Sequence, residues 1–206
     1  MNKTRMEAFS DGVIAILITI MVFDIKAPPG ADAAALLSVA PTILTYLLSF
    51  LYLGIYWNNH HHLLQITRRI NGAVLWANLH LLFWLSLFPF TTSWLHASHF
   101  SSLPAAVYGA VLLLAAVAYL ILQTVIIRAD GLESKLRQAI GGDIKGKLSP
   151  AAYVLGIAAS HWNAWVSVGL YSSVALLWLI PDRRIEVTIQ QVDRVPHDAD
   201  MTLRQP

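Results

Sequence analysis

An acidic residue, Asp11, lies inside the first apolar segment of the chain. The segment opens with Arg5-Met6-Glu7-Ala8-Phe9-Ser10-Asp11-Gly12 and then runs apolar to Phe23. An ionisable side chain is costly inside a membrane span, and it marks a functional or tightly partnered site. The plainer interpretation is that Asp11 lies at the membrane interface and caps or pairs locally, for example with Arg5. Its position alone leaves both interpretations open.

One side of this segment carries a narrow stripe of mostly apolar residues. At about 100° per residue around a helix, five positions line up closely: Gly12, Ile16, Thr19 and Phe23, with Ile20 at the edge. Asp11 points about 100° away from Gly12, and Ser10 lies nearly opposite the stripe. If the stripe faces a pore, Ser10 and Asp11 face neighbouring helices and anchor the helix. Otherwise the stripe is ordinary core or lipid contact.

A run of histidines closes the second apolar segment, in the sequence Tyr56-Trp57-Asn58-Asn59-His60-His61-His62. Three consecutive histidines cannot all bind one metal from a regular helix, because neighbours diverge by about 100°. A metal would need ligands from elsewhere, such as His80, and no His-Glu-x-x-His motif occurs. We therefore expect no metal site. We expect Trp57 and one or two of the histidines to hydrogen-bond to a neighbouring helix, and Asn78 to satisfy a partner across a helix interface.

The sequence carries no recognisable catalytic constellation. It has no Gly-x-Ser-x-Gly, no P-loop, no Ser-Lys or Ser-His pair at a readable spacing and no paired acids inside an apolar segment. It has no cysteine, which excludes disulfides and thiol chemistry, and the potassium filter Thr-Val-Gly-Tyr-Gly is absent. The formal net charge is only +2, so nothing suggests nucleic acid. We predict that the chain is not an enzyme and uses no cofactor.

The elements that must position these residues are membrane-spanning helices. Of the residues, 56% are hydrophobic and 13% are charged, whereas about a quarter are charged in an ordinary soluble domain. The charges gather at a few points between long charge-free stretches, and about 20 apolar residues suffice to cross a bilayer as a helix. We predict an all-α membrane protein with six transmembrane helices, at about residues 8–24, 35–60, 71–91, 104–127, 150–162 and 164–181.

The last two predicted helices come from one apolar run, residues 150–180, which is too long for one ordinary span. The polar cluster Ser160-His161-Trp162-Asn163 lies midway and indicates a tight turn. Residues 128–148 are predicted to form a cytoplasmic loop, and His96 and His99 to lie solvated in an outer loop. Residues 1–184 would form the membrane domain, and residues 185–206 a cytoplasmic tail.

The distribution of lysine and arginine predicts the orientation. With the N-terminus inside, every lysine and arginine except Lys26 falls on the inner side, as the positive-inside rule requires. A five-span chain would place Arg183 and Arg184 outside. We therefore predict an even number of spans with both termini cytoplasmic.

Several of these residues together resemble a known family. Arg5-x-x-x-Phe9-Ser10-Asp11, at the head of the first span, resembles the signature of the transmembrane protein 175 family in its bacterial branch. Tyr56-Trp57-x-x-His60-His61 closing the second span, Asn78 in the third and Leu177-Trp178-Leu179-Ile180-Pro181 closing the last support this resemblance. It covers the chain from Arg5 to about Arg184.

The resemblance implies a potassium-permeable channel without the usual filter loop. Bacterial members carry one six-span repeat and assemble as tetramers, with the pore lined by the first helix. The family's narrowest point is a ring of bulky aliphatic residues five positions after the motif aspartate, which here is Ile16. A threonine linked to selectivity corresponds to Thr19. Phe23, near the outer mouth, departs from the smaller aliphatic residues more usual there.

The motif and the residues level with it are expected to hold this helix in place from behind: Arg5, Phe9, Ser10, Asp11, Trp57, His60, His61 and Asn78. We therefore expect a homotetrameric, modestly potassium-selective cation channel, with potassium as the permeant ion, in the lipid bilayer of a bacterial plasma membrane. A hydrophobic ring at Ile16 can also gate by dewetting.

Three other functions remain as alternatives. A small secondary transporter or proton-coupled protein would use Asp11 and a histidine for proton relay and would show saturable, coupled flux. It is disfavoured because the sequence has no internal repeat and no pair of glycine- or proline-broken helices. A membrane enzyme would bind a metal at the histidine cluster. A structural membrane protein would transport nothing.

Overall fold

The described part of the chain is almost entirely helical. The structure, a computed structural model, describes residues 2–131 and 144–179. Its elements in chain order are α1 (Lys3–Met21), the short 3-10 helix η1 (Val22–Asp24), α2 (Ala33–Ser38), α3 (Ala40–Ile66), α4 (Gly72–Ser86), α5 (Phe88–Ala97), α6 (Ser102–Asp130), α8 (Ile144–Ala159) and α9 (Ala164–Leu179). The predicted tail at 185–206, the middle of the predicted loop at 132–143 and Ile180-Pro181 lie outside the described residues.

Four helical stretches are long and apolar enough to cross a membrane: Lys3–Asp24, Ala40–Ile66, Gly72–Ala97 and Ser102–Asp130. Two shorter apolar helices follow at Leu148–Ala159 and Ala164–Leu179. These stretches confirm the prediction of an all-helical membrane protein. A span count of six stays a prediction, because α8 and α9 have 16 residues each, fewer than the roughly 20 that usually cross the hydrocarbon.

Two of the predicted helices are each divided into two, and a proline lies just after each break. The predicted helix at 35–60 is split at Val39 into α2 and α3, with Pro41 in the first turn of α3, and α3 continues through the histidines to Ile66. The predicted helix at 71–91 ends as α4 at Ser86 and restarts as α5, with Pro89 in its first turn. A proline is tolerated in a first turn because the amide hydrogen it lacks has no partner there.

The restart at Phe88 makes one of the sequence predictions wrong. His96 belongs to α5, which runs to Ala97, and its ring is half-buried instead of solvated in a loop. Its Nδ1 lies 3.5 Å from the Thr42 hydroxyl at the start of α3. The exposed loop begins just after it and contains His99. The other predicted turn, at Ser160-His161-Trp162-Asn163, is where the structure also has one, between α8 and α9.

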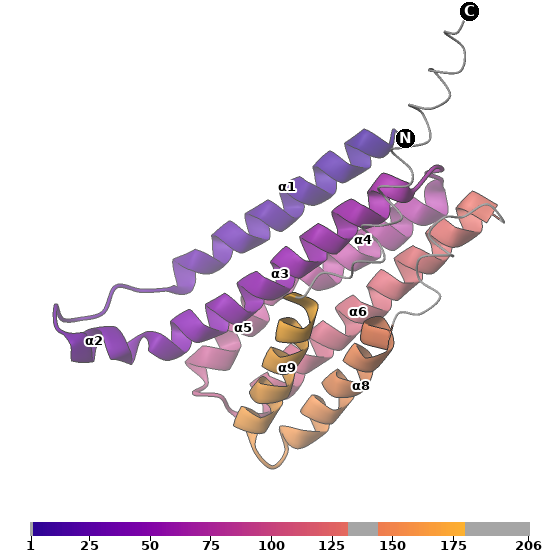
Figure 1. The fold of residues 1–206 in the computed structure, drawn as a ribbon. Helices are drawn as coiled ribbons and strands as arrows, with labels where there is room; N and C mark the ends of the chain where they lie inside the picture. The colour runs from indigo at the N-terminus through magenta and orange to yellow at the C-terminus, as the bar shows by residue number, and fades with distance from the viewer. Residues whose placement is uncertain (1, 132–143, 180–206) are drawn as a thin grey trace, which may run out of the picture.

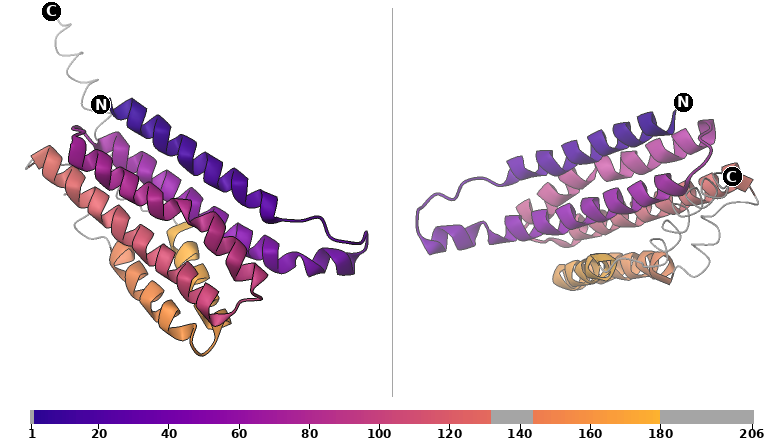
Figure 2. Two further views of the ribbon diagram at one scale, coloured as in Figure 1. Left: turned by 180° about the vertical axis from the view of Figure 1, so that it is seen from behind. Right: turned by 45° about the horizontal axis from the view of Figure 1, so that its top comes forward.

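The helices are arranged with α1 and α9 far apart. Figure 1 shows α1 along one edge of the bundle and the short α8–α9 pair along the opposite edge, with α3, α4 and α6 between them. The contacts agree, since α1 packs on α3, α4 and α5, whereas α8 packs on α6 and α9. Figure 2 shows the same separation from two other directions. The start of α1 and the α3–α4 connection lie at the same end of the bundle, where the Lys3 ammonium donates a hydrogen bond to the Gln65 carbonyl at 2.9 Å.

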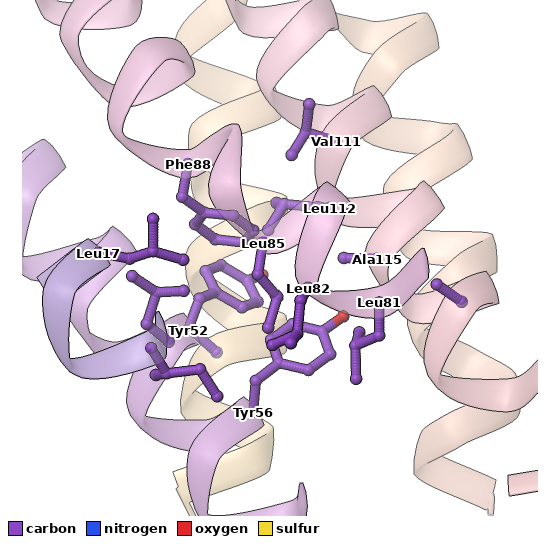
Figure 3. Close-up of a cluster of buried hydrophobic side chains, with 14 of the residues drawn as sticks. Leu17, Tyr52, Tyr56, Leu81, Leu82, Leu85, Phe88, Val111, Leu112 and Ala115 are labelled. Atoms are coloured by element: carbon purple, nitrogen blue, oxygen red, sulfur yellow. The ribbon is translucent and has the colours of Figure 1, made fainter. Parts of the chain in front are cut away.

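A single apolar core joins these helices. Figure 3 shows its centre, to which α1 contributes Leu17, α3 contributes Tyr52 and Tyr56, α4 contributes Leu85 and α6 contributes Leu112. Lipid tails are as apolar as leucine, so the hydrophobic effect gives little preference for helix contacts over lipid contacts. Close packing and hydrogen bonds between helices must therefore hold the bundle together.

Candidate pore helix and its anchoring network

The two faces of α1 have opposite surroundings. Its buried residues recur every three or four positions and form one face that packs on α3, α4 and α5: Met6, Ser10, Ile14, Leu17 and Met21. A helix with one packed face has this spacing. The opposite face contacts no other part of the described chain.

The predicted stripe lies on the open face. Ile16 is 57% exposed and Phe23 is 74% exposed, and Thr19 and Ile20 are exposed as well. A side chain added at Gly12 would meet open space. Whatever covers this stripe therefore comes from outside the described chain, either as lipid or as another copy.

Thr19 forms the local hydrogen bond that is common for threonine in helices. Its hydroxyl donates to the carbonyl of Ile16 at 2.9 Å. A hydroxyl has one hydrogen to donate but two lone pairs to accept with. The lone pairs of Thr19 therefore remain available to a water molecule or a cation on the open face.

Behind the stripe, a buried hydrogen-bond chain links α1 to α3 and α4. The Asn78 amide of α4 donates from Nδ2 to the Ser10 hydroxyl of α1 at 2.9 Å. The Ser10 hydroxyl donates to the Met6 carbonyl at 2.9 Å. On its other side, Asn78 Oδ1 lies 2.7 Å from His60 Nε2 of α3. All three side chains are buried.

The partners in this chain determine where the hydrogens lie. Ser10 uses its only hydrogen on Met6, so it must accept from the Asn78 amide nitrogen. The Asn78 oxygen then faces His60, and Nε2 of His60 must carry the hydrogen that this oxygen accepts. This leaves Nδ1 of His60 as a buried acceptor without a partner in the described structure. One buried amide thus connects three helices and fixes the histidine tautomer.

Asp11 is held by a second contact, with α3. The Trp57 indole nitrogen donates to Asp11 Oδ1 at 3.0 Å. The indole ring stacks on the ring of His61, with a centroid distance of 6.3 Å. His61 Nδ1 in turn lies 3.0 Å from Glu7 Oε1, one turn before Asp11 on α1. Two carboxylates of α1 therefore face α3, and neither belongs to the stripe.

Two of the expected anchoring residues lie elsewhere. Arg5 and Phe9 are exposed and fall on the same side of α1 as the stripe, since they precede Gly12 and Ile16 by seven residues each. Among the described residues, no ion pair joins Arg5 to Asp11. The structure therefore brings six of the eight expected residues together and leaves Arg5 and Phe9 on the open face.

Glu7 is a site residue that the sequence analysis did not single out. It precedes Asp11 by four residues, so helix spacing places both carboxylates on one side of α1. That spacing was the available signal. The other histidine considered, His80, accepts a hydrogen bond from Trp84 within α4 at 2.9 Å, away from the cluster on α3. In the described part of the chain, no three His, Asp or Glu side chains converge in a way that would hold a metal ion.

Comparisons with known proteins agree on one group. Residues 5–89 match the family model described as endosomal/lysosomal potassium channel TMEM175. A potassium channel of Chryseobacterium sp. (strain P1-3) is 53% identical over 191 residues, covering 93% of this chain and all of the relative. A potassium channel of Chamaesiphon minutus is 31% identical over 85% of this chain and 93% of its own length.

The fold of the chain is similar to that of a solved channel. The crystal structure of a lysosomal potassium-selective channel TMEM175 homolog from Chamaesiphon minutus superposes with a TM-score of 0.76. The match covers 86% of this chain and 96% of the solved one, at 28% sequence identity. The family match includes the whole of α1 from Arg5 onward, α3 and α4, which together carry the stripe and the anchoring network.

Proposed function

Because the chain belongs to the transmembrane protein 175 family, we propose that it is a potassium channel whose ion path is formed by α1 from several copies. The family consists of ion channels, so the chain is an integral membrane protein and not an enzyme. The family assignment also favours a channel over a small transporter or a purely structural membrane protein.

The observation that carries this proposal is the open stripe on α1. Ile16 and Phe23 are exposed on the side of α1 that faces away from the bundle, because α1 packs on α3, α4 and α5 through its other face only. One helix cannot enclose a water path, so several copies must place their stripes around a common axis. We propose four copies, as the resemblance to bacterial members implies. Closed rotational symmetry is usual for such assemblies.

Ile16 is the proposed constriction. Four isoleucine side chains around an axis offer no fixed coordination, so a potassium ion passing them must lose part of its hydration shell. The Thr19 hydroxyls, one turn further along, can compensate in part through their free lone pairs. This arrangement predicts modest selectivity over sodium and a gate that closes by dewetting. Gly12 would leave the path wider on the inner side, and Ile20 and Phe23 would line the outer side.

The buried network gives α1 a defined rotation about its own axis. Asn78 holds Ser10 from α4, and Trp57 holds Asp11 from α3, so the helix is tied in two directions. Rotation by one residue, about 100°, would replace Ile16 on the axis with a neighbouring side chain. We propose that the network keeps the stripe on the ion path and that it contains no residue that contacts the ion.

The orientation and the number of spans belong to the same proposal. We propose six spans per chain, with α8 and α9 as the fifth and sixth, and both termini on the cytoplasmic side of a bacterial plasma membrane. The inner side would then carry all lysines and arginines except Lys26.

The purified protein in planar bilayers tests the proposal. Under asymmetric potassium and sodium, the wild type should pass a cation current whose reversal potential favours potassium. Ile16→Asn should raise the conductance severalfold, because an amide wets the ring. The matched control is Ile121→Asn, the same substitution at an exposed isoleucine of α6, far from α1. If Ile16→Asn and Ile121→Asn leave the current equally unchanged at equal expression, Ile16 is not the narrowest point.

A further inference from the structure

A small cavity lies within the bundle between α3, α6, α8 and α9, away from α1. Its volume is about 50 Å³. Four tyrosines line it, Tyr52 and Tyr56 from α3, Tyr119 from α6 and Tyr153 from α8, together with Trp178 of α9. The polar groups that border it are the amides of Asn59 and Gln123 and the hydroxyl of Ser149.

The most informative of these groups is Gln123. Its side chain is only 7% exposed, and it lies in the second half of the membrane-spanning helix α6 (Ser102–Asp130). No other described side chain or backbone group hydrogen-bonds to its amide, and the same holds for the Asn59 amide and the Tyr56 hydroxyl. A carboxamide has two hydrogens to donate and an oxygen that accepts. Leaving such a group unpaired in an apolar interior is unfavourable, because its lost hydrogen bonds to water are not replaced.

The neighbouring polar groups cannot supply the missing partners. The Ser149 hydroxyl donates to the Lys145 carbonyl at 2.8 Å and accepts from the Trp178 indole at 2.8 Å. The Tyr119 hydroxyl donates to the backbone carbonyl of Asn59 at 3.1 Å. The two carboxamides therefore share the space with the Tyr56 hydroxyl, whereas the hydroxyls of Ser149 and Tyr119 already donate to other groups.

We propose that this cavity is a binding site for a small cluster of water molecules inside each subunit. A water molecule needs roughly 10–15 Å³ of such space and two to four polar partners. The volume of about 50 Å³ suits a few waters, and Asn59, Gln123 and Tyr56 provide the partners. Apolar cavities of this size stay empty, whereas polar ones hold ordered water. A lipid tail would fill the space but would leave the carboxamides unpaired.

This water site is separate from the proposed ion path. The cavity is bordered by one side of α3, the side that contains Tyr52, Tyr56 and Asn59. Trp57, which holds Asp11 of α1, points about 100° away from Tyr56 around the same helix. His60 follows Tyr56 by four residues, but its ring bonds to Asn78 of α4, and neither His60 nor Asn78 borders the cavity. The channel therefore has a dry constriction at its axis and a hydrated pocket behind α3.

Radiolytic hydroxyl-radical footprinting of the full channel tests the site. Radicals made from a buried water modify only side chains beside it, and tyrosine reacts readily. Tyr56 and Tyr153 are almost fully buried, yet the wild type should show severalfold more modification there than at Tyr108 and Tyr171. Tyr108 and Tyr171 are 1% and 0% exposed, against 3% for Tyr153 and 8% for Tyr56, and their hydroxyls bond to protein groups, at 2.9 Å to Ser49 and 3.2 Å to the Ala105 carbonyl.

Two variants sharpen the test. Gln123→Leu should reduce the modification of Tyr56 and Tyr153 to the level of Tyr108, because it removes the main polar partner of the waters. Thr124→Val is the matched control, since it removes an adjacent but exposed hydroxyl of α6 that bonds within its own helix. It should leave the modification unchanged.

The proposal is overturned if Tyr56 and Tyr153 are modified no more than Tyr108 in the wild type. That result, which does not depend on how Gln123→Leu folds, would indicate an empty cavity or one filled by a lipid tail. Equal modification in Gln123→Leu and the wild type would also overturn it.

The potassium current of Gln123→Leu should match that of the wild type. A changed ion selectivity would contradict the separation of this cavity from the ion path. Neither footprinting result bears on whether α1 forms the pore.

Discussion

The helix α1 and the α6–α8–α9 region are held in place by different physical means. The helix α1 packs on one face only, and side-chain hydrogen bonds from Asn78 and Trp57 fix its position. In the other region an aromatic ring packs directly on two glycines. A methyl group at Gly109 of α6 or Gly156 of α8 would overlap the ring of Tyr171.

Tyr171 is the centre of that close packing. Its hydroxyl donates to the Ala105 carbonyl at 3.2 Å, and its own carbonyl accepts from the Tyr52 hydroxyl at 2.6 Å. It is fully buried between helices that contribute glycines. Small residues that let helices approach closely are a usual means of association in membranes. The scaffold thus combines close packing around Tyr171 with hydrogen bonds, whereas the proposed pore helix packs on one face only and depends more on directed polar bonds.

The difference fits the proposed roles. A helix that must leave one face open to an ion path cannot be surrounded by packed neighbours. A few hydrogen bonds on its closed side can still set its rotation, because they are directional. Substitutions should therefore affect the two regions in different ways, and four variants separate them.

The largest effect is expected in the scaffold. Gly109→Val forces a branched side chain into the Tyr171 ring, and overpacking of this kind destabilises by about 3 kcal/mol or more. The folded fraction after size-exclusion chromatography should fall sharply. Gly169→Val is the matched control on α9, where an added side chain meets open space and should be tolerated. Equal folded yields for the two variants would mean that the helices adjust freely and that shape does not specify this region.

Asn78→Leu should have the next largest effect, because it removes partners from two helices at once. Ser10 loses its donor and His60 Nε2 loses its acceptor, and each buried orphan costs about 1–3 kcal/mol. We expect a lower melting temperature in fluorescence-detected unfolding. In a double-mutant cycle, Ser10→Ala should add little to Asn78→Leu. Full additivity would show that the two side chains act independently.

Asp11→Ala should have a smaller effect on stability. Its partner is the neutral Trp57 indole, and the carboxylate is only partly buried, so the loss is closer to one hydrogen bond, about 1–2 kcal/mol, than to a broken buried ion pair. We expect the variant to lose assembly to a larger extent than it changes ion selectivity. Size-exclusion chromatography measures the assembly, and single-channel recording measures the selectivity. A stable assembly with strongly altered selectivity would mean that Asp11 faces the ion path.

Thr19→Val should leave stability nearly unchanged, because the hydroxyl is exposed and bonds only within its own helix. Under bi-ionic conditions the reversal potential should move toward equal potassium and sodium permeability. Thr124→Val, an exposed threonine of α6 with the same type of local bond, is the control. If both variants keep the wild-type reversal potential, the Thr19 hydroxyl has no part in selectivity.

Part of the architecture was readable from the sequence because it depends on local geometry. The apolar segments, their lengths and the angular alignment of Ile16 with Thr19 follow from the helix repeat alone, and the structure places both on one exposed face of α1. The helix boundaries were less accurate. The predicted helices at 35–60 and 71–91 are each divided in the structure, with Pro41 and Pro89 in the first turn of the second piece. That difference moved His96 from a loop into α5.

The sequence by itself determined which residue types face each side of α1, and the motif Arg5-x-x-x-Phe9-Ser10-Asp11 pointed to the family. Only the tertiary structure decided which side chains contact each other across helices. Asn78 bonds to both Ser10 and His60, and Glu7 bonds to His61. It also decided that Gln123 faces a polar cavity and that Tyr171 packs against two glycines. The physical reason is that spacing along one helix is set by its own backbone. Contacts between helices depend on their relative depth and rotation, which no single helix encodes.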